Sequence, residues 1–164
     1  MIAGERGFSL VEAQVALLIW ALAVLALVSV QAKSLSQARD SEFGGRVGDA
    51  VAALASAIQA SPESVWPHYL EGGYDDHMSG GDCLTACSAQ QLADAALFRF
   101  KRALQAEGRS VRARGIVCRG DSKVRPTLAN AGCDGKGEWA VRVAWRARLG
   151  GKWLEHAGVW PLRP

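Results

Sequence analysis

The first third of the chain lacks two kinds of residue, and each absence excludes a class of structure. No charged residue occurs between Ala13 and Val30, although charged residues make up 21% of the chain. Such a long uncharged run is unlike ordinary soluble sequence, so we expect this segment to lie outside the globular domain. No proline occurs from residue 8 to residue 61. A proline kink is therefore excluded there, and one long helix is possible until Pro62 stops it.

The sequence also lacks the arrangements that catalysis or metal binding would need. No nucleophile, base and orienting acid occur at a spacing that indicates an active site. The side chains that most invite a metal or catalytic interpretation lie in one Gly-rich stretch, at Asp75, Asp76, His77, Ser79 and Asp82. Their spacing is not that of a calcium-binding loop. We interpret the stretch as a solvated loop, and we expect no enzyme activity, no metal and no cofactor.

An apolar run of about 23 residues, from Phe8 to Val30, dominates the N-terminal part of the chain. At 1.5 Å per residue, a helix of this length crosses a hydrocarbon layer about 30 Å thick. Its only charge is Glu12. A carboxylate inside an apolar helix is costly without a partner, which makes Glu12 a functional candidate. In the alternative, the run is a plain single-pass anchor in which Glu12 reaches the headgroup region.

A short polar leader, Met1 to Gly7, precedes the apolar run. A secretory signal has its small-residue cleavage site after the apolar stretch. Here the order is reversed, so a cut after Gly7 leaves the apolar segment attached to the mature chain.

The segment 7–12, GFSLVE, followed by an apolar helix, resembles the prepilin motif of type IV pilins and type II secretion pseudopilins. The resemblance implies cleavage between Gly7 and Phe8 by a prepilin peptidase, N-methylation of Phe8 and a role for Glu12 in assembly. It also implies a periplasmic domain anchored in the inner membrane and later built into a filament. In a stack of subunits, the Glu12 carboxylate could pair with the Phe8 amine of a neighbour, each charge offsetting the other's desolvation.

Beyond Val30, apolar residues at three- and four-residue steps predict that the helix continues as an amphipathic half over residues 31–61. The stripe consists of Phe43, Val47, Val51, Leu54 and Ile58. Gly44, Gly45 and Gly48 weaken this half, so a bend or local melting is expected there. Residues 62–164 then form the globular head, which packs against the stripe.

The head is predicted to combine a second helix with a small antiparallel sheet. The capping box from Ser88 to Gln91 starts a helix over Ala89 to Glu107. Its apolar face contains Leu92, Ala96, Leu97, Phe100, Ala103 and Leu104. Alternation from Trp139 to Ala147 predicts a half-buried strand, flanked by strands over Val111–Cys118 and Trp153–Trp160, with a turn at residues 150–151. The expected class is α+β, with the type IV pilin fold implied by the resemblance.

Four cysteines, Cys83, Cys87, Cys118 and Cys133, all lie in the head. An even number in a small domain indicates disulfides formed in an oxidising compartment. Zinc is the alternative, but only a loose match to zinc-ligand spacing exists. The sequence alone allows three pairings.

The sequence around these cysteines resembles that of PilV-type minor pilins, except that Phe100 stands where a tryptophan is often seen. The resemblance implies that Cys83 pairs with Cys87 and Cys118 with Cys133.

Five arginines, Arg112, Arg114, Arg142, Arg146 and Arg148, fall on or beside two predicted strands. If the strands are neighbours, they form a positive patch on a chain of net charge +3. Such a patch could bind DNA phosphates. The favoured interpretation is a solvated sheet face that meets acidic surfaces of adjacent pilins and discourages unwanted edge pairing.

The expected function is that of a minor pilin that initiates or joins a type IV pilus through its N-terminal helix. Its expected partners are other minor and major pilins, the prepilin peptidase, the inner-membrane assembly machinery and a tip adhesin. A type II secretion pseudopilin is the first alternative, because it shares the leader and the helix. A DNA-binding pilin is the second, and it depends on the arginines alone.

Overall fold

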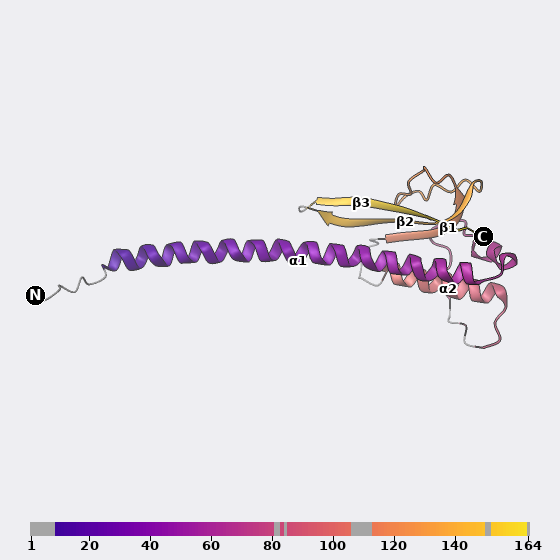
Figure 1. The fold of residues 1–164 in the computed structure, drawn as a ribbon, viewed down its shortest axis with the longest axis horizontal. Coiled ribbons are helices and arrows are strands. Elements are labelled where there is room, and N and C mark those ends of the chain that lie inside the picture. The colour runs from indigo at the N-terminus through magenta and orange to yellow at the C-terminus, as the bar shows by residue number, and fades with distance from the viewer. Residues whose placement is uncertain (1–8, 81–82, 84, 106–112, 150–151, 164) are drawn as a thin grey trace, which may run out of the picture. The chain divides into compact units, whose positions relative to one another are not determined.

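The computed structural model describes residues 9–80, 83, 85–105, 113–149 and 152–163. It contains a long N-terminal helix, a second helix and a small antiparallel sheet (Figure 1). The elements are α1 (Leu10–Ala60), the 3-10 helix η1 (Glu63–Tyr69), α2 (Ala89–Gln105), β1 (Ala113–Gly120), β2 (Glu138–Leu149) and β3 (Lys152–Pro161). The predicted α+β class is confirmed, and the arrangement is consistent with a pilin-like fold.

The chain divides into two compact units, residues 1–39 and 40–164, and α1 passes through the boundary. α1 ends at Ala60, one residue before the predicted end at Ser61. The helix also continues through Gly44, Gly45 and Gly48 without interruption. The local melting expected at the glycines is therefore wrong, because the neighbouring side chains Phe43 and Val47 are buried in the core and hold the helix in place.

The predicted stripe of α1 is confirmed as part of the main core of the second unit. Its five side chains, Phe43, Val47, Val51, Leu54 and Ile58, are each at most 4% exposed. They pack in one cluster with Trp66 and Tyr69 of η1, with α2, and with the apolar face of the sheet. Trp66 and Tyr69 anchor the segment that follows α1 to this core, and the Trp66 ring meets Trp139 of β2 edge-on with centroids 5.7 Å apart.

The face of α2 that enters the core differs from the predicted face at several positions: Ala93 and Ala95 are also buried, and the predicted Ala103 is exposed. Leu97, Phe100 and Leu104 are buried as expected, but Leu92 is 50% exposed and Lys101 is only 3% exposed. The buried positions follow helical spacing through residue 101, so Lys101 occupies an apolar position and must find partners inside the protein.

The three strands lie side by side in the order β1-β2-β3, and both pairs are antiparallel (Figure 1). Val117 lies opposite Val141 and Gly115 opposite Val143, on the face that meets the helices. Gly115 allows this contact to be close, because a Cβ there would lie 2.5 Å from Cζ of Phe100.

The second face of the sheet was predicted to be solvated, and this prediction is wrong over most of its length. Ala140, Arg142 and Ala144 of β2 are buried, as are Ile116 and Cys118 of β1. Cys118 is bonded to Cys133, and Val124 and Ala131, which lie in the loop between these two cysteines, both accept hydrogen bonds from Arg142. The loop therefore covers this face.

Candidate assembly site and its surroundings

The first unit presents its apolar side chains to the surroundings. Every described residue from Ser9 to Ala38 is exposed, including Leu10 at 74% and Trp20 at 67%. α1 is long and apolar enough to cross a membrane. Nothing else in the described part of residues 1–39 covers these side chains. Exposure of so many apolar side chains is costly in water and favourable in hydrocarbon.

Glu12 has a partner within its own chain, and sequence reasoning missed it. Oε2 of Glu12 accepts a hydrogen bond from the backbone N–H of Ser9 at 3.1 Å. In return, the Ser9 hydroxyl oxygen accepts one from the backbone N–H of Glu12 at 3.4 Å. This reciprocal pair is a capping box, and the pattern Ser-x-x-Glu at positions 9–12 was available as its signal.

The two other residues of the predicted processing site, Gly7 and Phe8, lie outside the described residues. Leader cleavage and N-methylation of Phe8 therefore stay predictions based on the resemblance.

The two disulfides have the pairing that the resemblance implied. Cys83 is bonded to Cys87, and Cys118 to Cys133. The first closes a short loop before α2. The second joins β1 to the loop that covers the sheet, and zinc is not the partner of any of the four sulfurs.

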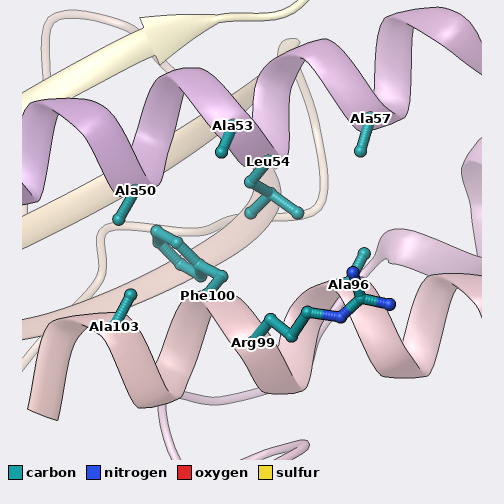
Figure 2. A pocket seen from close by; sticks show the side chains of 8 residues that line it. All are labelled: Ala50, Ala53, Leu54, Ala57, Ala96, Arg99, Phe100 and Ala103. Atoms are coloured by element: carbon teal, nitrogen blue, oxygen red, sulfur yellow. The ribbon is translucent and has the colours of Figure 1, made fainter. Parts of the chain in front are cut away.

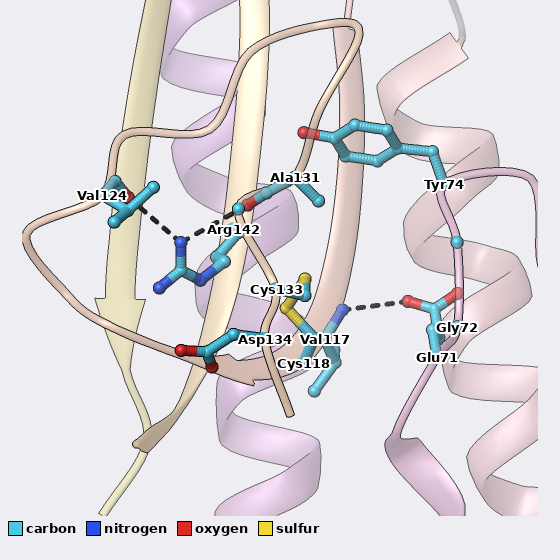
Figure 3. Close-up of a disulfide and its surroundings, with 12 residues drawn as sticks. Glu71, Gly72, Tyr74, Val117, Cys118, Val124, Ala131, Cys133, Asp134 and Arg142 are labelled. Carbon is cyan, nitrogen blue, oxygen red and sulfur yellow. Dashed lines mark hydrogen bonds between the residues drawn. A yellow bond between two sulfur atoms is a disulfide. The ribbon is translucent and has the colours of Figure 1, made fainter. Parts of the chain in front are cut away.

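Arg142 was predicted to lie in a surface patch, but it is 0% exposed, which corrects the prediction. Its guanidinium donates to backbone carbonyls of the covering loop: Nη1 to Val124 at 3.0 Å and to Ala131 at 3.3 Å, and Nη2 to Asp121 at 2.5 Å. Figure 3 shows the guanidinium directed at Val124 and Ala131, near the Cys118–Cys133 bond. Nε is buried without a hydrogen-bond partner among the described residues. Arg142 therefore holds the loop on the sheet.

The other predicted patch residues do not gather into one positive surface in the described structure. Both oxygens of the Asp75 carboxylate accept from Nη2 of Arg114, at 2.6 and 2.9 Å, which neutralises its charge locally. The Arg146 side chain is 56% exposed and lies 3.8 Å from the Glu155 carboxylate. Arg112 lies outside the described residues, and Arg148 lies on β2 with its side chain outside the described part.

The connector between η1 and α2 is held at its start by a buried ion pair, while Asp75, Asp76 and Ser79 further along it are exposed, as predicted for a solvated loop. Nζ of Lys101 lies 2.8 Å from Oε1 of Glu71 and donates to the carbonyls of Tyr74 and Gly115. Oε2 of Glu71 accepts from the backbone N–H of Val117 at 3.0 Å (Figure 3). Burial raises the pKa of Glu71 above its usual range, and Lys101 offsets part of this effect.

Two of the connector residues singled out in the sequence, His77 and Asp76, form polar contacts that hold the connector in place. His77 places Nδ1 3.3 Å from Oε1 of Glu71 and Nε2 3.1 Å from Oδ1 of Asp94. Asp76 accepts from the backbone N–H groups of Gly72 and Gly73. No group of three or more His, Cys, Asp or Glu side chains suited to a metal ion occurs among the described residues.

An apolar groove of about 220 Å³ lies between α1 and α2 within the second unit (Figure 2). Alanines from both helices line it, with Leu54, Phe100 and Arg99: they are Ala50, Ala53, Ala57, Ala96 and Ala103. Arg99 is the only charged residue among those lining the groove. Because few polar groups converge there, the groove lacks the features of a small-molecule site.

Comparisons of the chain with protein-family models, with curated proteins and with solved structures found no match. The residues and geometry described above are therefore the whole basis for a functional interpretation.

Proposed function

We propose that the protein is a minor pilin that enters a type IV pilus through its N-terminal helix. The observation that carries the proposal is the exposed apolar run in the first part of α1, residues 10–30, in which Glu12 is the single carboxylate. The prepilin-like segment 7–12 immediately precedes and begins this helix.

The exposed helix supports assembly because its apolar side chains need a non-aqueous environment at every stage. The inner membrane supplies that environment before assembly, and the packed helices of a filament core supply it afterwards. The second unit has its own core and disulfides. These features suit a head that stays in an oxidising compartment outside the membrane.

The position of Glu12 supports a role in joining subunits. An isolated carboxylate in an apolar environment is costly, and an amine of a neighbouring subunit would offset that cost. In the proposed filament this amine belongs to Phe8, exposed when the peptidase removes residues 1–7. Other minor and major pilins, the assembly machinery and a tip adhesin are the proposed partners.

The test is complementation of a strain that lacks the gene. Wild-type protein restores surface pili, counted by electron microscopy, whereas Glu12→Gln does not, because the amide carries no charge to pair with an amine. Glu42→Gln is the matched control: Glu42 lies on the same helix, outside the apolar run, and forms an exposed pair with Arg46. The control restores pili because an exposed pair of this kind contributes at most about 1 kcal/mol.

Mass spectrometry of the mature protein provides an independent check. We expect the loss of residues 1–7 and one added methyl group on Phe8. An intact Met1, or loss of the entire apolar segment, would contradict the proposal. A strain that keeps its pili but loses protein secretion would instead identify a type II secretion pseudopilin.

A further inference from the structure

The β2–β3 hairpin carries exposed apolar side chains close to its closed end. Trp153 of β3 is 51% exposed, and its neighbour Leu154 is 42% exposed. Lys152, the first residue of the strand, is exposed as well. We propose that these three residues contact the headgroup region of the membrane that holds the apolar run of α1. The inference rests on the membrane stage of the proposed function and adds a second membrane contact to it.

The two apolar side chains lie on opposite faces of the hairpin. Successive residues of a strand point to opposite sides, and residues paired across two strands share a side. Leu154 is paired with Ala147, which shares a face with Trp145, a residue packed against the core. Trp153 is paired with Arg148 and is therefore on the other face. A protein docked on one face would leave the other in water, whereas a headgroup region surrounds both.

The three side chains have the chemistry of a membrane interface. Tryptophan is enriched there because its ring is apolar and its N–H can meet the polar headgroups. A lysine beside it can pair with lipid phosphates while its methylene groups lie on apolar surface. Glu155 is the next charged residue of β3, and Nη2 of Arg146 lies 3.8 Å from its carboxylate. This carboxylate therefore does not add an unpaired negative charge near Lys152.

The fold directs the closed end of the hairpin away from the C-terminal end of α1. At its other end, β2 lies beside that end of the helix, because Trp139 meets Trp66, whose Nε1 donates to the Ser61 carbonyl. From Trp139 to Leu149, β2 is about 33 Å long. From Ser61 back to Phe43, the first residue of the core, the chain spans about 27 Å. The strand is the longer, and Figure 1 shows the hairpin running along α1 in this direction.

The length of the chain allows the hairpin to reach the headgroups. Val30 ends the apolar run, and a helix spans at most about 20 Å between Phe43 and Val30. β2 extends past Phe43 by about 6 Å, and the headgroup region occupies about 5–8 Å beyond the hydrocarbon. Less than about 10 Å remains, which the Trp153 side chain and the usual helix tilt of about 20° can cover.

Tryptophan emission tests the contact in the full-length protein, reconstituted into vesicles of phosphatidylcholine and phosphatidylglycerol. Bromine on a lipid chain quenches nearby indoles, so lipids brominated close to the headgroups report on the interface. The emission lost on the substitution Trp153→Phe is measured in brominated and in unbrominated vesicles. We expect this loss to be about two-fold smaller in brominated vesicles, because an indole at headgroup depth is already quenched there. Phenylalanine is a mild change at an exposed position, so the variant stays folded.

Two matched variants complete the series. Trp160→Phe changes a half-buried tryptophan of the same strand that packs against the core. Its loss of emission should be the same in both kinds of vesicle. Trp20→Phe reports on the apolar run of α1, and lipids brominated deep in their acyl chains should quench Trp20.

Equal losses for Trp153→Phe in the two kinds of vesicle overturn the membrane contact. They do so whether acrylamide in the water then reaches Trp153 or a protein partner shields it. If Trp20 is quenched in the same experiment, the membrane stage of the proposed function survives this result. An unquenched Trp20 would overturn the membrane anchor itself, on which the proposed function depends.

Discussion

At the scale of single residues, Arg142 has a structural role that its position in the sequence does not indicate. It is fully buried, and its guanidinium donates to three carbonyls of the covering loop. The loop also needs glycine next to this group, because a Cβ on Gly120 would lie 2.9 Å from Nη2 and one on Gly132 would lie 3.0 Å from Nη1. Arg142 is thus part of the packing of the head.

Substitution of Arg142 tests this role. Arg142→Ala should lower the free energy of unfolding of the full-length protein in detergent by about 3–5 kcal/mol, because three carbonyls of the covering loop lose their donor and a cavity forms where the buried side chain was. Chemical denaturation followed by tryptophan fluorescence measures the change. Arg146→Ala is the matched control on the same face of the same strand, and its effect should stay within about 0.5 kcal/mol. Equal effects of the two substitutions would contradict the structural role.

The buried pair of Glu71 and Lys101 predicts a pH dependence of stability. Burial raises the pKa of Glu71 above 4.5, so the folded state binds its proton more tightly than the unfolded state does. The stabilisation from this proton is complete below about pH 4.5 and is lost as the pH rises towards the folded-state pKa. In Glu71→Gln, which cannot titrate, this loss is absent.

We therefore expect the stability of the wild type, measured relative to Glu71→Gln, to fall as the pH is raised from 4.5 to 8. Denaturation curves of both proteins at a series of pH values measure this difference. Asp75→Asn provides a control carboxylate in the same connector, exposed and paired with Arg114. A stability difference that is constant, or that grows with pH, would show that the pKa of Glu71 is not raised in the folded state.

At the scale of elements, the three glycines of α1 have a different role from the glycine of β1. A Cβ on Gly44, Gly45 or Gly48 meets no atom within 4 Å. A Cβ on Gly115 meets Phe100 and Leu104 within 2.7 Å. Space is therefore available on the helix and absent in the sheet.

Alanine substitution should distinguish the two elements. Each of Gly44→Ala, Gly45→Ala and Gly48→Ala should raise the free energy of unfolding by about 0.5–1 kcal/mol, because alanine favours the helix. Gly115→Ala should lower it by about 1–3 kcal/mol, because the core cannot take another methyl group without moving. Thermal unfolding measured by circular dichroism gives both signs. Destabilisation by the helix substitutions would mean that these positions are closely packed.

The two disulfides should differ in their contribution to stability because they close loops of different length. Cys118 and Cys133 are separated by 15 positions, and Cys83 and Cys87 by 4. In the chain-entropy model, the longer loop contributes about 3 kcal/mol and the shorter about 2 kcal/mol.

Chemical denaturation of the two double serine variants under oxidising conditions would test this difference. The Cys118→Ser/Cys133→Ser variant should be the less stable, and its amides between residues 121 and 132 should exchange with solvent faster than in the wild type. The Cys83→Ser/Cys87→Ser variant serves as the control and should leave that exchange unchanged. Unchanged exchange in the first variant would show that Arg142 alone holds the loop.

At the scale of the whole molecule, the described arginines do not gather into the positive patch that the DNA-binding alternative depends on. The net charge is only +3, Arg142 is buried, and Arg114 is paired with Asp75. Nonspecific binding to DNA depends on many simultaneous phosphate contacts. We therefore expect no shift of duplex DNA by the full-length protein in a gel assay at low salt. A shift that disappears on addition of salt would revive the DNA-binding alternative.

Much of the fold could be predicted because its elements follow simple periodicities. The stripe from Phe43 to Ile58 has helical spacing, and the strand that begins near Trp139 alternates, so both were found from the sequence. The α2 start at Ala89 followed from the capping box at Ser88, which the structure contains. At the candidate site, Glu12 was singled out by its isolation in an apolar run, and its role in assembly stays a prediction.

The contacts that were missed join residues far apart in the sequence. Lys101 lies on α2 and Glu71 in the connector after η1. The residues next to each of them in the sequence do not indicate that its side chain is buried. Arg142 follows the alternation of β2 onto the second face of the sheet, which would be polar if no loop covered it. Nothing periodic in the loop around Val124 indicates that it covers that face. The Ser9–Glu12 pair is local and was missed because Glu12 was considered only as a partner for another chain.

The bond between Cys118 and Cys133 has a consequence for when the head matures. Until those sulfurs are oxidised, nothing covalent holds the loop carbonyls over the Arg142 guanidinium, and a charged group on the sheet can admit water. Completion of the head therefore depends on an oxidant. A newly made chain that remains among reducing thiols holds this loop by the Arg142 hydrogen bonds alone, so the redox state of its surroundings affects how firmly this side of the sheet is covered.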